Sequence, residues 1–572
     1  MLTLDTRSQV LTLLDAAALG PTGQDEAALI FVSQTQDPVT VSRRAFRQAV
    51  LEAAAALLNQ GVGARDLIVI AHVQSLESIA TFWGALWIGA IPSMFPTLTE
   101  KLDPEIYRRS IGDLVAREGV KAVFTTEEFA PYLREVVHCA VYSSAAGVTG
   151  DESVLPDGTG YSADPDEIAF LQHSSGTTGL QKGVALSHRA VLNHLASYCD
   201  AIAIDESDVV VSWLPLYHDM GLIAGFLMPL IQGIPLVLMS PFEWVKAPAM
   251  LLRAISEYRG TLCWLPNFAY NHCARRIRER DLQGLSIASM RMFINTSEPV
   301  LASSHQMFYE RFASIGCRRE MLSTSYGMAE NVFAVTQTRF GIVPPVETID
   351  RVLLEEQGRA VVVPADHPNA VVKTSCGEPI DGTEMCVIDP STGRVLGERE
   401  VGEYAIRSNC LLSEYYRRPD LNPIEADGWY RTGDIGYLAG GRAYVSGRVK
   451  DLIINGGKNI FPADLEAIVN EVGGVHPGRA VVFGVFDERE GTELIAVIAE
   501  VRGAPDGESL RTIIADLRRT VATRAGVTAS FVKLVDDRWL IKTSSGKIAR
   551  NANRAKWLRE REEEQSALSS ET

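Results

Sequence analysis

Residues 173–183 read HSSGTTGLQKG, a run of small polar residues that closes with a lysine and a glycine. The run follows the apolar stretch Ile168–Leu171, which predicts a strand that leads into a loop. Small residues let a ligand approach the backbone, and successive N–H groups, hydroxyls and one lysine suit a polyphosphate. The spacing is not that of a P-loop, G-x-x-x-x-G-K-[ST]. The alternative is a flexible Gly/Ser/Thr loop without a ligand.

Helix and strand patterns alternate through the N-terminal part of the chain. Ser42 can cap a helix that ends before Gly61, and the continuous apolar run Leu67–Ala71 predicts a buried strand. A further helix is expected over 76–88 and a strand over 90–95. Fully apolar strands that alternate with helices predict an α/β fold with sheets covered on both faces.

Two later tracts break this pattern. Residues 331–376 mix short β-like pieces at 360–363 and 370–373 with polar turns, which predicts an insertion on the main scaffold. A domain boundary is expected near Lys450, so that residues 1–449 form a large domain and residues 450–572 a smaller α+β domain. The second domain should contain helices from about 463 and 510 and strands at 480–485, 494–501 and 531–534, with fraying from about Arg559 onward.

Composition excludes several classes of protein. A chain of 572 residues is too long for one ordinary domain, and a net charge of −17 disfavours nucleic acid as a partner. The eight cysteines include no C-x-x-C pair, so we expect small buried residues in a reducing, cytoplasmic compartment rather than disulfides or a zinc site. The N-terminus lacks the basic start of a signal peptide.

One uncharged run, Gly221–Met239, is about as long as a membrane span. Pro229, Gly233 and Pro235 interrupt it, however. We therefore expect a short buried helix, a turn and a strand here, and no membrane span.

Further motifs follow the 173–183 run in a fixed order. They place a histidine and an aspartate after an apolar run, an aromatic ring beside a carboxylate, and a lysine in a Ser/Gly segment near the C-terminus. The motifs are WLPLYHDMGL at 213–222, NTSEP at 295–299, SYGMAE at 325–330, TGD at 432–434, GRVKD at 447–451 and KTSSGKIAR at 542–550.

In this order, over about residues 41–550, the set resembles the acyl-adenylate-forming superfamily of acyl-CoA synthetases, nonribosomal peptide adenylation domains and luciferases. The runs 214–222, 265–270 and 297–300, and the long 331–376 tract, are most similar to the fatty acyl-AMP ligases. The resemblance implies stacked αβ sheets with a small β-barrel-like subdomain, followed by a mobile C-terminal domain.

The resemblance also implies roles for individual residues. Lys547 would be the catalytic cation, His218 would lie between the nucleotide and acyl pockets, Lys450 would be the hinge, and Glu330 would bind Mg²⁺. Tyr326 would flank the adenine of ATP, while Asp434 and Arg448 would reach the ribose. The full expected ATP/AMP site comprises Ser174, Ser175, Gly176, Thr177, Thr178, Gly179, Lys182, Ser297, Glu298, Pro299, Tyr326, Gly327, Met328, Ala329, Asp434 and Arg448.

Each residue also has a simpler interpretation. His218 could be a satisfied core histidine, and Arg448 and Lys450 could form a solvated charge cluster with Asp451. Lys547 could be an exposed lysine on a polar loop. The ordered set favours function.

The expected reaction uses ATP and Mg²⁺ to convert a hydrophobic carboxylic acid, fatty or bulky, into acyl-AMP and then into a thioester. The acceptor stays open, because segment 454–460 looks more like a CoA synthetase while the 331–376 tract implies an acyl carrier protein. Gln181 and Ile541 replace prolines that are usual in the family, which affects loop stiffness more than charge. The alternatives are a CoA ligase and a binding protein that has lost catalysis.

Overall fold

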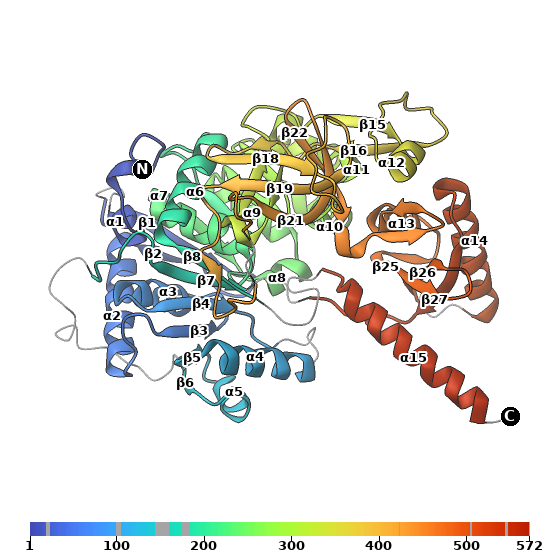
Figure 1. Ribbon diagram of the computed structural model, residues 1–572. Coiled ribbons are helices and arrows are strands. Elements are labelled where there is room, and N and C mark those ends of the chain that lie inside the picture. The colour runs from blue at the N-terminus through green and yellow to red at the C-terminus, as the bar shows by residue number, and fades with distance from the viewer. Residues whose placement is uncertain are drawn as a thin grey trace.

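The computed structural model is a mixed α/β fold whose described residues form six sheets, two of them of only two strands (Figure 1). The structure describes residues 1–18, 23–98, 104–143, 160–173, 182–421, 424–503, 506–543 and 547–570. Two large sheets and a small antiparallel sheet precede residue 449, and a three-stranded sheet follows it.

The seven-stranded sheet has the order β20-β8-β7-β4-β3-β5-β6. Strands β3 to β7 pair in parallel, whereas β8 and β20 add antiparallel neighbours. All residues of β3 and β4 are buried, as the apolar runs predicted. The strands are β3 (Leu67–Ala71), β4 (Ile91–Phe95), β5 (Ala122–Thr125), β6 (Ala140–Ser143), β7 (Ile168–His173), β8 (Gly183–Ser187) and β20 (Glu414–Tyr415).

The nine-stranded sheet has the order β17-β14-β13-β12-β11-β9-β10-β1-β2. Its central strands, from β13 to β1, are all parallel, so their carboxyl ends share one edge. The strands are β1 (Ala27–Val32), β2 (Val39–Ser42), β9 (Val210–Ser212), β10 (Leu236–Met239), β11 (Leu262–Leu265), β12 (Met292–Asn295), β13 (Leu322–Gly327), β14 (Ala334–Gln337) and β17 (Glu378–Pro379).

Helices cover these two sheets, and the largest apolar core lies among them. Ser42 starts α2 as predicted, because its side chain accepts the N–H of Ala45. Helices α2 and α3 approach closely at Gly84, where a Cβ would lie 2.8 Å from the backbone nitrogen of Ala54. The main helices are α1 (Leu13–Ala18), α2 (Arg43–Asn59), α3 (Leu76–Trp87), α4 (Pro104–Glu118), α5 (Ala130–Val136), α6 (His188–Ala201), α7 (Met228–Gln232), α8 (Pro241–Lys246), α9 (Ala249–Tyr258), α10 (Asn267–Arg276) and α11 (Ala302–Phe312).

The uncharged run at 221–239 is buried in this core. A π-helical segment, η4 (Met220–Leu227), continues into α7, and Gly233 with φ 70° turns the chain into β10. The expected helix, turn and strand are therefore present. Among the described residues, no helix is both long and apolar enough to cross a bilayer.

The small antiparallel sheet consists of β18 (Thr383–Ile388), β19 (Gly402–Ser408), β21 (Tyr430–Ala439) and β22 (Arg442–Arg448). The resemblance implied a β-barrel-like subdomain here, and the described strands form a four-stranded sheet that does not close into a barrel. Segment 331–376 contributes the hairpin of β15 (Val346–Asp350) and β16 (Ala370–Thr374). The sequence missed α12 (Arg351–Gln357), which Asp350 caps, and residues 360–363 supply only an isolated bridge at Val362.

The elements after residue 449 group apart from the large sheets (Figure 1). The helices and strands expected near 463, 480, 494, 510 and 531 are all present. They are β23 (Ile453–Asn455), β24 (Lys458–Ile460), α13 (Pro462–Val469), β25 (Val475–Asp487), β26 (Thr492–Val501), α14 (Gly507–Ala525), β27 (Ala529–Val535) and α15 (Arg550–Ser570).

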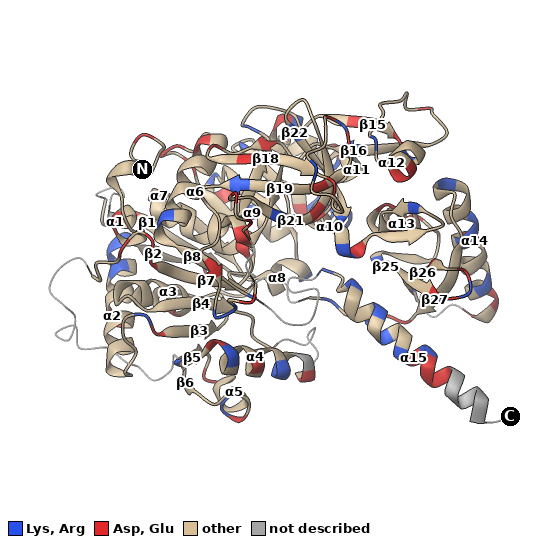
Figure 2. Cartoon of the chain, in the orientation of Figure 1, with Lys and Arg blue, Asp and Glu red and all other residues tan. Residues whose placement is uncertain are grey.

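The expectation of fraying from Arg559 is wrong, because α15 continues to Ser570. Glu560 accepts from Lys533 at 2.7 Å and from the Trp539 indole at 3.2 Å, and Arg561 packs 4.3 Å from the centre of the Phe531 ring. Basic residues precede acidic ones along this helix (Figure 2).

Segment 331–376 contacts the C-terminal elements through ion pairs. Lys373 on β16 is nearly buried and lies 2.9 Å from Asp464 on α13. Lys458 on β24 pairs with Glu356 on α12 at 2.9 Å. Beside them, Glu355 is 3% exposed and pairs with Arg351 at 2.8 Å. Burial raises the pKa of Glu355 to about 7, although Arg351 opposes that change.

Stability is expected to depend on pH through Glu355. A carboxyl group whose pKa is raised on folding contributes stability below its unfolded pKa, and that contribution is lost as the pH rises through the folded value. A rise from 4.5 to about 7 corresponds to about 3 kcal/mol. We expect the fall in unfolding free energy from about pH 5 to about pH 8 to be smaller in Glu355→Gln than in the parent. Denaturant titrations at both pH values measure the free energy of unfolding. Glu356→Gln, at the exposed neighbouring carboxylate, is the control. Parallel profiles for the parent and Glu355→Gln would contradict it.

Candidate active site

Two of the predicted motifs lie next to each other at the carboxyl ends of β12 and β13. Ser297–Pro299 follows β12 and Tyr326–Glu330 closes β13, two strands that pair in parallel. Ser297 has φ 70° and Val332 has φ 64°, which is unfavourable for a β-branched residue. The carbonyl of Val332 accepts from the Gln172 side chain at 2.9 Å, so β7 holds this turn from the neighbouring sheet.

Tyr326, Asp434 and Arg448 form a cluster in which the first two residues are buried and Arg448 is half-exposed. The Tyr326 hydroxyl donates to Asp434 Oδ2 at 2.7 Å, and Arg448 Nε lies 3.0 Å from Asp434 Oδ1. Asp434 and Arg448 are cross-strand partners on β21 and β22, which explains their contact. Asp434 raises the pKa of Arg448, while burial and Asp434 raise that of Tyr326 well above its usual value. Both oxygens of Asp434 therefore already have protein partners.

Glu330 is joined to Lys182 through an aromatic ring. The Tyr415 hydroxyl donates to Glu330 Oε1 at 2.9 Å, and Lys182 Nζ lies 4.5 Å from the centre of the Tyr415 ring. Burial raises the pKa of Glu330 above its usual value. A metal ion or another cation beside this carboxylate would favour its charged form.

Lys547 is partly buried, within electrostatic reach of two carboxylates. Burial lowers its pKa, and the charges of Asp219 and Glu298 oppose that effect. Burial alone would raise the pKa of Asp219, but His218 and Lys547 together lower it below its usual value. Burial raises the pKa of Glu298, whose Oε2 accepts the backbone N–H of Phe268 at 2.9 Å. His218 Nδ1 is in direct contact with Asp219.

The C-terminal elements hold Lys547 in this position. The Thr543 N–H donates to the carbonyl of Lys547 at 2.7 Å, and Lys542 and Ile548 form an isolated antiparallel bridge. Arg550, three residues later, pairs with Asp451 at 2.7 Å and with Glu466 at 2.8 Å. These ion pairs of Arg550 connect the segment that carries Lys547 to α13 and to Asp451, the residue that follows Lys450.

Comparison with known proteins identifies this arrangement. Residues 17–416 match the family described as AMP-binding enzyme. The chain belongs to that family. Among the relatives of this AMP-binding enzyme is the medium-chain-fatty-acid–[acyl-carrier-protein] ligase JamA of Moorena producens, 30% identical over 88% of this chain and 87% of that one. The long-chain-fatty-acid–AMP ligase FadD32 of Mycolicibacterium smegmatis is 31% identical, over 88% and 87%.

A solved structure has the same fold. It comes from structural and functional studies of fatty acyl-adenylate ligases from E. coli and L. pneumophila. It superposes with a TM-score of 0.87 at 29% identity and covers 99% of each chain. The large sheets and the C-terminal elements of this AMP-binding enzyme are therefore arranged as in a fatty acyl-adenylate ligase.

The structure brings most of the predicted residues of this AMP-binding enzyme together. Lys547 lies within electrostatic reach of Glu298, Asp434 and Arg448, although they come from different elements. Lys450 lies in the 3₁₀ turn Val449–Asp451, where burial lowers its pKa. The predicted residues Ser174, Ser175, Gly176, Thr177, Thr178 and Gly179 lie outside the described residues.

Sequence reasoning missed several contributors. Asp219 stands next to His218 in a quoted motif, so the sequence already pointed to it; its electrostatic interaction with Lys547 appears only in the structure. Tyr415 and Gln172 carried no signal, because only the folded chain places them beside Glu330 and Val332.

A buried network of hydrogen bonds lies at His173, the residue that directly precedes the 174–182 run. His173 and Gly183 are cross-strand partners on β7 and β8, the two strands that flank the run. His173 Nε2 lies 3.2 Å from Glu118 Oε2, and its Nδ1 lies 2.9 Å from Ser93 Oγ. A Cβ at position 183 would lie 3.1 Å from the Glu118 carboxylate. Glu118 is 1% exposed, so β7 and β8 both pack against a buried carboxylate in this AMP-binding enzyme.

Proposed function

We propose that this enzyme activates a medium- or long-chain fatty acid with ATP and transfers the acyl group to the thiol of an acyl carrier protein. One observation carries the proposal: a partly buried lysine from the C-terminal part lies within electrostatic reach of Asp434, Arg448 and the carboxylates of Asp219 and Glu298. The relatives named above act on fatty acids, and one is a carrier-protein ligase by name.

In the first step, an oxygen of the substrate carboxylate forms a bond to the α-phosphorus of ATP. The bond from that phosphorus to pyrophosphate breaks, and acyl-AMP forms. Two anions must meet, so the site has to offset charge and fix their geometry. Lys547 supplies a cation, and the charges of Asp219 and Glu298 favour its charged form against the effect of partial burial.

The remaining predicted residues position the nucleotide. Residues 174–179 and Lys182 bind the β- and γ-phosphates, Tyr326 flanks adenine, and Asp434 and Arg448 bind the ribose. Asp434 can still accept from ribose hydroxyls, because a carboxylate offers about four lone-pair sites and two are used. Ser297, Glu298, Pro299, Gly327, Met328 and Ala329 line the adenine pocket.

The donor set fits a magnesium ion. The described residues contain no cluster of three or more potential protein ligands, and Mg²⁺ in nucleotide sites takes one or two carboxylates together with phosphates and water. Glu330 would hold it, and the bound ion would neutralise charge on the leaving pyrophosphate.

In the second step, the carrier thiol attacks the acyl carbonyl carbon, the thiol proton is lost, and AMP leaves. Lys547 has to withdraw to let a thiol approach. The domain of residues 450–572 therefore turns at Lys450, and His218 separates the nucleotide from the acyl chain. Movement breaks the Lys373–Asp464 and Lys458–Glu356 pairs.

Acid-dependent exchange of labelled pyrophosphate into ATP tests the first step. We expect exchange with fatty acids and less with short-chain acids, because the residues around 264–270 are apolar and aromatic. Absence of exchange across the whole panel would favour a binding protein over a ligase.

Acyl transfer to a phosphopantetheinylated acyl carrier protein, beside CoA at equal concentration, tests the second step. We expect acyl-carrier product to exceed acyl-CoA. Rapid formation of acyl-CoA would instead identify a CoA ligase, as segment 454–460 suggested.

A further inference from the structure

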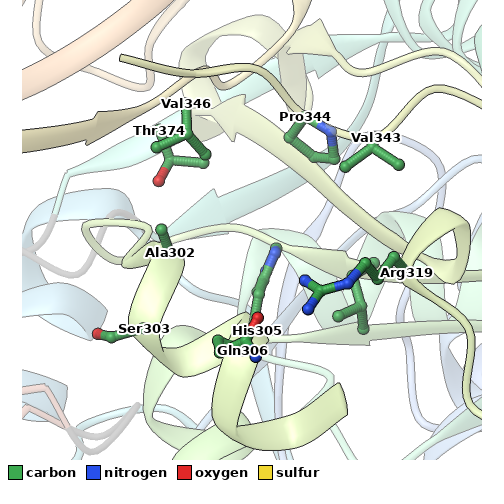
Figure 3. Close-up of a pocket in the computed structure, with 10 residues that line it drawn as sticks. Ala302, Ser303, His305, Gln306, Arg319, Val343, Pro344, Val346 and Thr374 are labelled. Atoms are coloured by element: carbon green, nitrogen blue, oxygen red, sulfur yellow. The ribbon is translucent and has the colours of Figure 1, made fainter. Parts of the chain in front are cut away.

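A cavity of about 360 Å³ lies between α11, the start of β13 and the 331–376 segment (Figure 3). The residues assigned to the nucleotide, acid and metal do not line it. Its apolar wall includes Leu322 and two valines, Val343 and Val346, which are 49% and 51% exposed. A cavity that holds benzene can be as small as about 150 Å³, so this one has room for a small organic molecule.

Thr374 places an unpartnered hydroxyl at the cavity. The residue is 7% exposed, and its Oγ1 is buried with no hydrogen-bond partner among the described residues. Figure 3 shows the side chain on β16 reaching toward α11. A buried polar atom without a partner costs about 1–3 kcal/mol, so an acceptor at this point would be stabilised.

His305 presents a second donor, and the hydrogen-bond network determines its tautomer. The N–H of Leu301 donates to Asn267 Oδ1 at 3.0 Å, so the atom of Asn295 that faces this oxygen must be its amide nitrogen. That nitrogen also lies 3.0 Å from His305 Nε2, which must then accept. Burial lowers the pKa of His305 to about 4, so the ring is neutral and carries its proton on Nδ1. Figure 3 shows the ring pointing into the cavity.

Arg319 supplies a cation at the same cavity. Its guanidinium packs 4.3 Å from the centre of the Tyr309 ring. Among the described residues no carboxylate pairs with Arg319, and none lines the cavity. The cavity therefore combines a cation, an N–H donor and a hydroxyl with an apolar wall in a chain of net charge −17.

We propose that this cavity binds a small organic anion whose head is a carboxylate or a phosphate. Arg319, His305 and Thr374 donate hydrogen bonds to the head. The apolar or aromatic body packs against Val343 and Val346. An anion suits the site because all three polar groups can donate; Arg319 has no acceptor, and the one acceptor nitrogen of His305 is already occupied by Asn295.

Isothermal titration with benzoate and with phenyl phosphate tests the proposal, and the two probes separate a carboxylate from a phosphate preference. We expect Arg319→Ala to weaken binding of the preferred probe by roughly tenfold or more, as loss of a charge-assisted hydrogen bond should. Val346→Trp, which fills the cavity, should abolish binding. Arg318→Ala is the matched control, because Arg318 is the adjacent exposed arginine and does not line the cavity.

Pyrophosphate exchange on the same variants reports whether each one is folded. Equal affinity in the parent, Arg319→Ala and Val346→Trp would place the probe elsewhere, for example in the acid site, and would overturn the proposal. Failure of both probes to bind the parent would also overturn it, without bearing on acyl-AMP formation.

Discussion

Replacing Lys547 with alanine is expected to slow acid-dependent pyrophosphate exchange by roughly 10²–10³-fold, the usual effect of removing one preorganised charge from a transition state. The lysine is partly buried and interacts electrostatically with Asp219 and Glu298, so a solvent cation would replace it poorly. Because the triphosphate has other proposed partners, the affinity for ATP should change little. Single-turnover acyl-AMP formation and calorimetric ATP binding together measure the two effects.

Two further variants separate charge from geometry in that experiment. Lys547→Arg keeps the positive charge but places it at a different distance from the backbone, so this variant should recover only part of the rate of pyrophosphate exchange. Lys533→Ala removes a lysine of the same C-terminal part that pairs with Glu560, and should leave exchange unchanged. Full activity in Lys547→Ala would show that the lysine is only a structural counter-charge for Asp219 and Glu298.

Replacing Asp434 with alanine is expected to lower kcat/KM for ATP by about 10- to 150-fold, since hydrogen bonds to a charged group contribute about 1.5–3 kcal/mol. The change leaves the Tyr326 hydroxyl without its acceptor and Arg448 without its partner. The KM for the fatty acid should stay near its parent value, because these residues belong to the nucleotide side.

Steady-state kinetics with each substrate varied in turn measure this effect. Asp434→Asn keeps an acceptor for Tyr326 but loses the charge opposite Arg448, so it should fall between the parent and the alanine variant. Glu384→Gln, an exposed carboxylate on β18 that pairs with Arg407, is the matched control. A lower melting temperature with unchanged KM for ATP would make Asp434 a purely structural residue.

Local patterns predicted most of the elements correctly. The buried runs at 67–71 and 91–95 became strands, Ser42 became a helix cap, and the C-terminal order of helices and strands was correct. These signals are short-range, since they depend on periodicity and on side chains that cap the adjacent backbone. Helix α12 and the end of α15 were missed because distant partners stabilise them: Lys458 pairs with Glu356 on α12, and Lys533 and Trp539 contact Glu560 on α15.

The sequence by itself determined the order of the motifs and which residue types could carry charge, because both are properties of the linear chain. Only the tertiary structure decided that Lys547 lies beside Asp219 and Glu298 and that Tyr415 contacts Glu330. It also decided that the base of the 174–182 run is held by Glu118. These contacts join residues tens to hundreds of positions apart, so they follow from sheet order and domain packing, which no local pattern encodes.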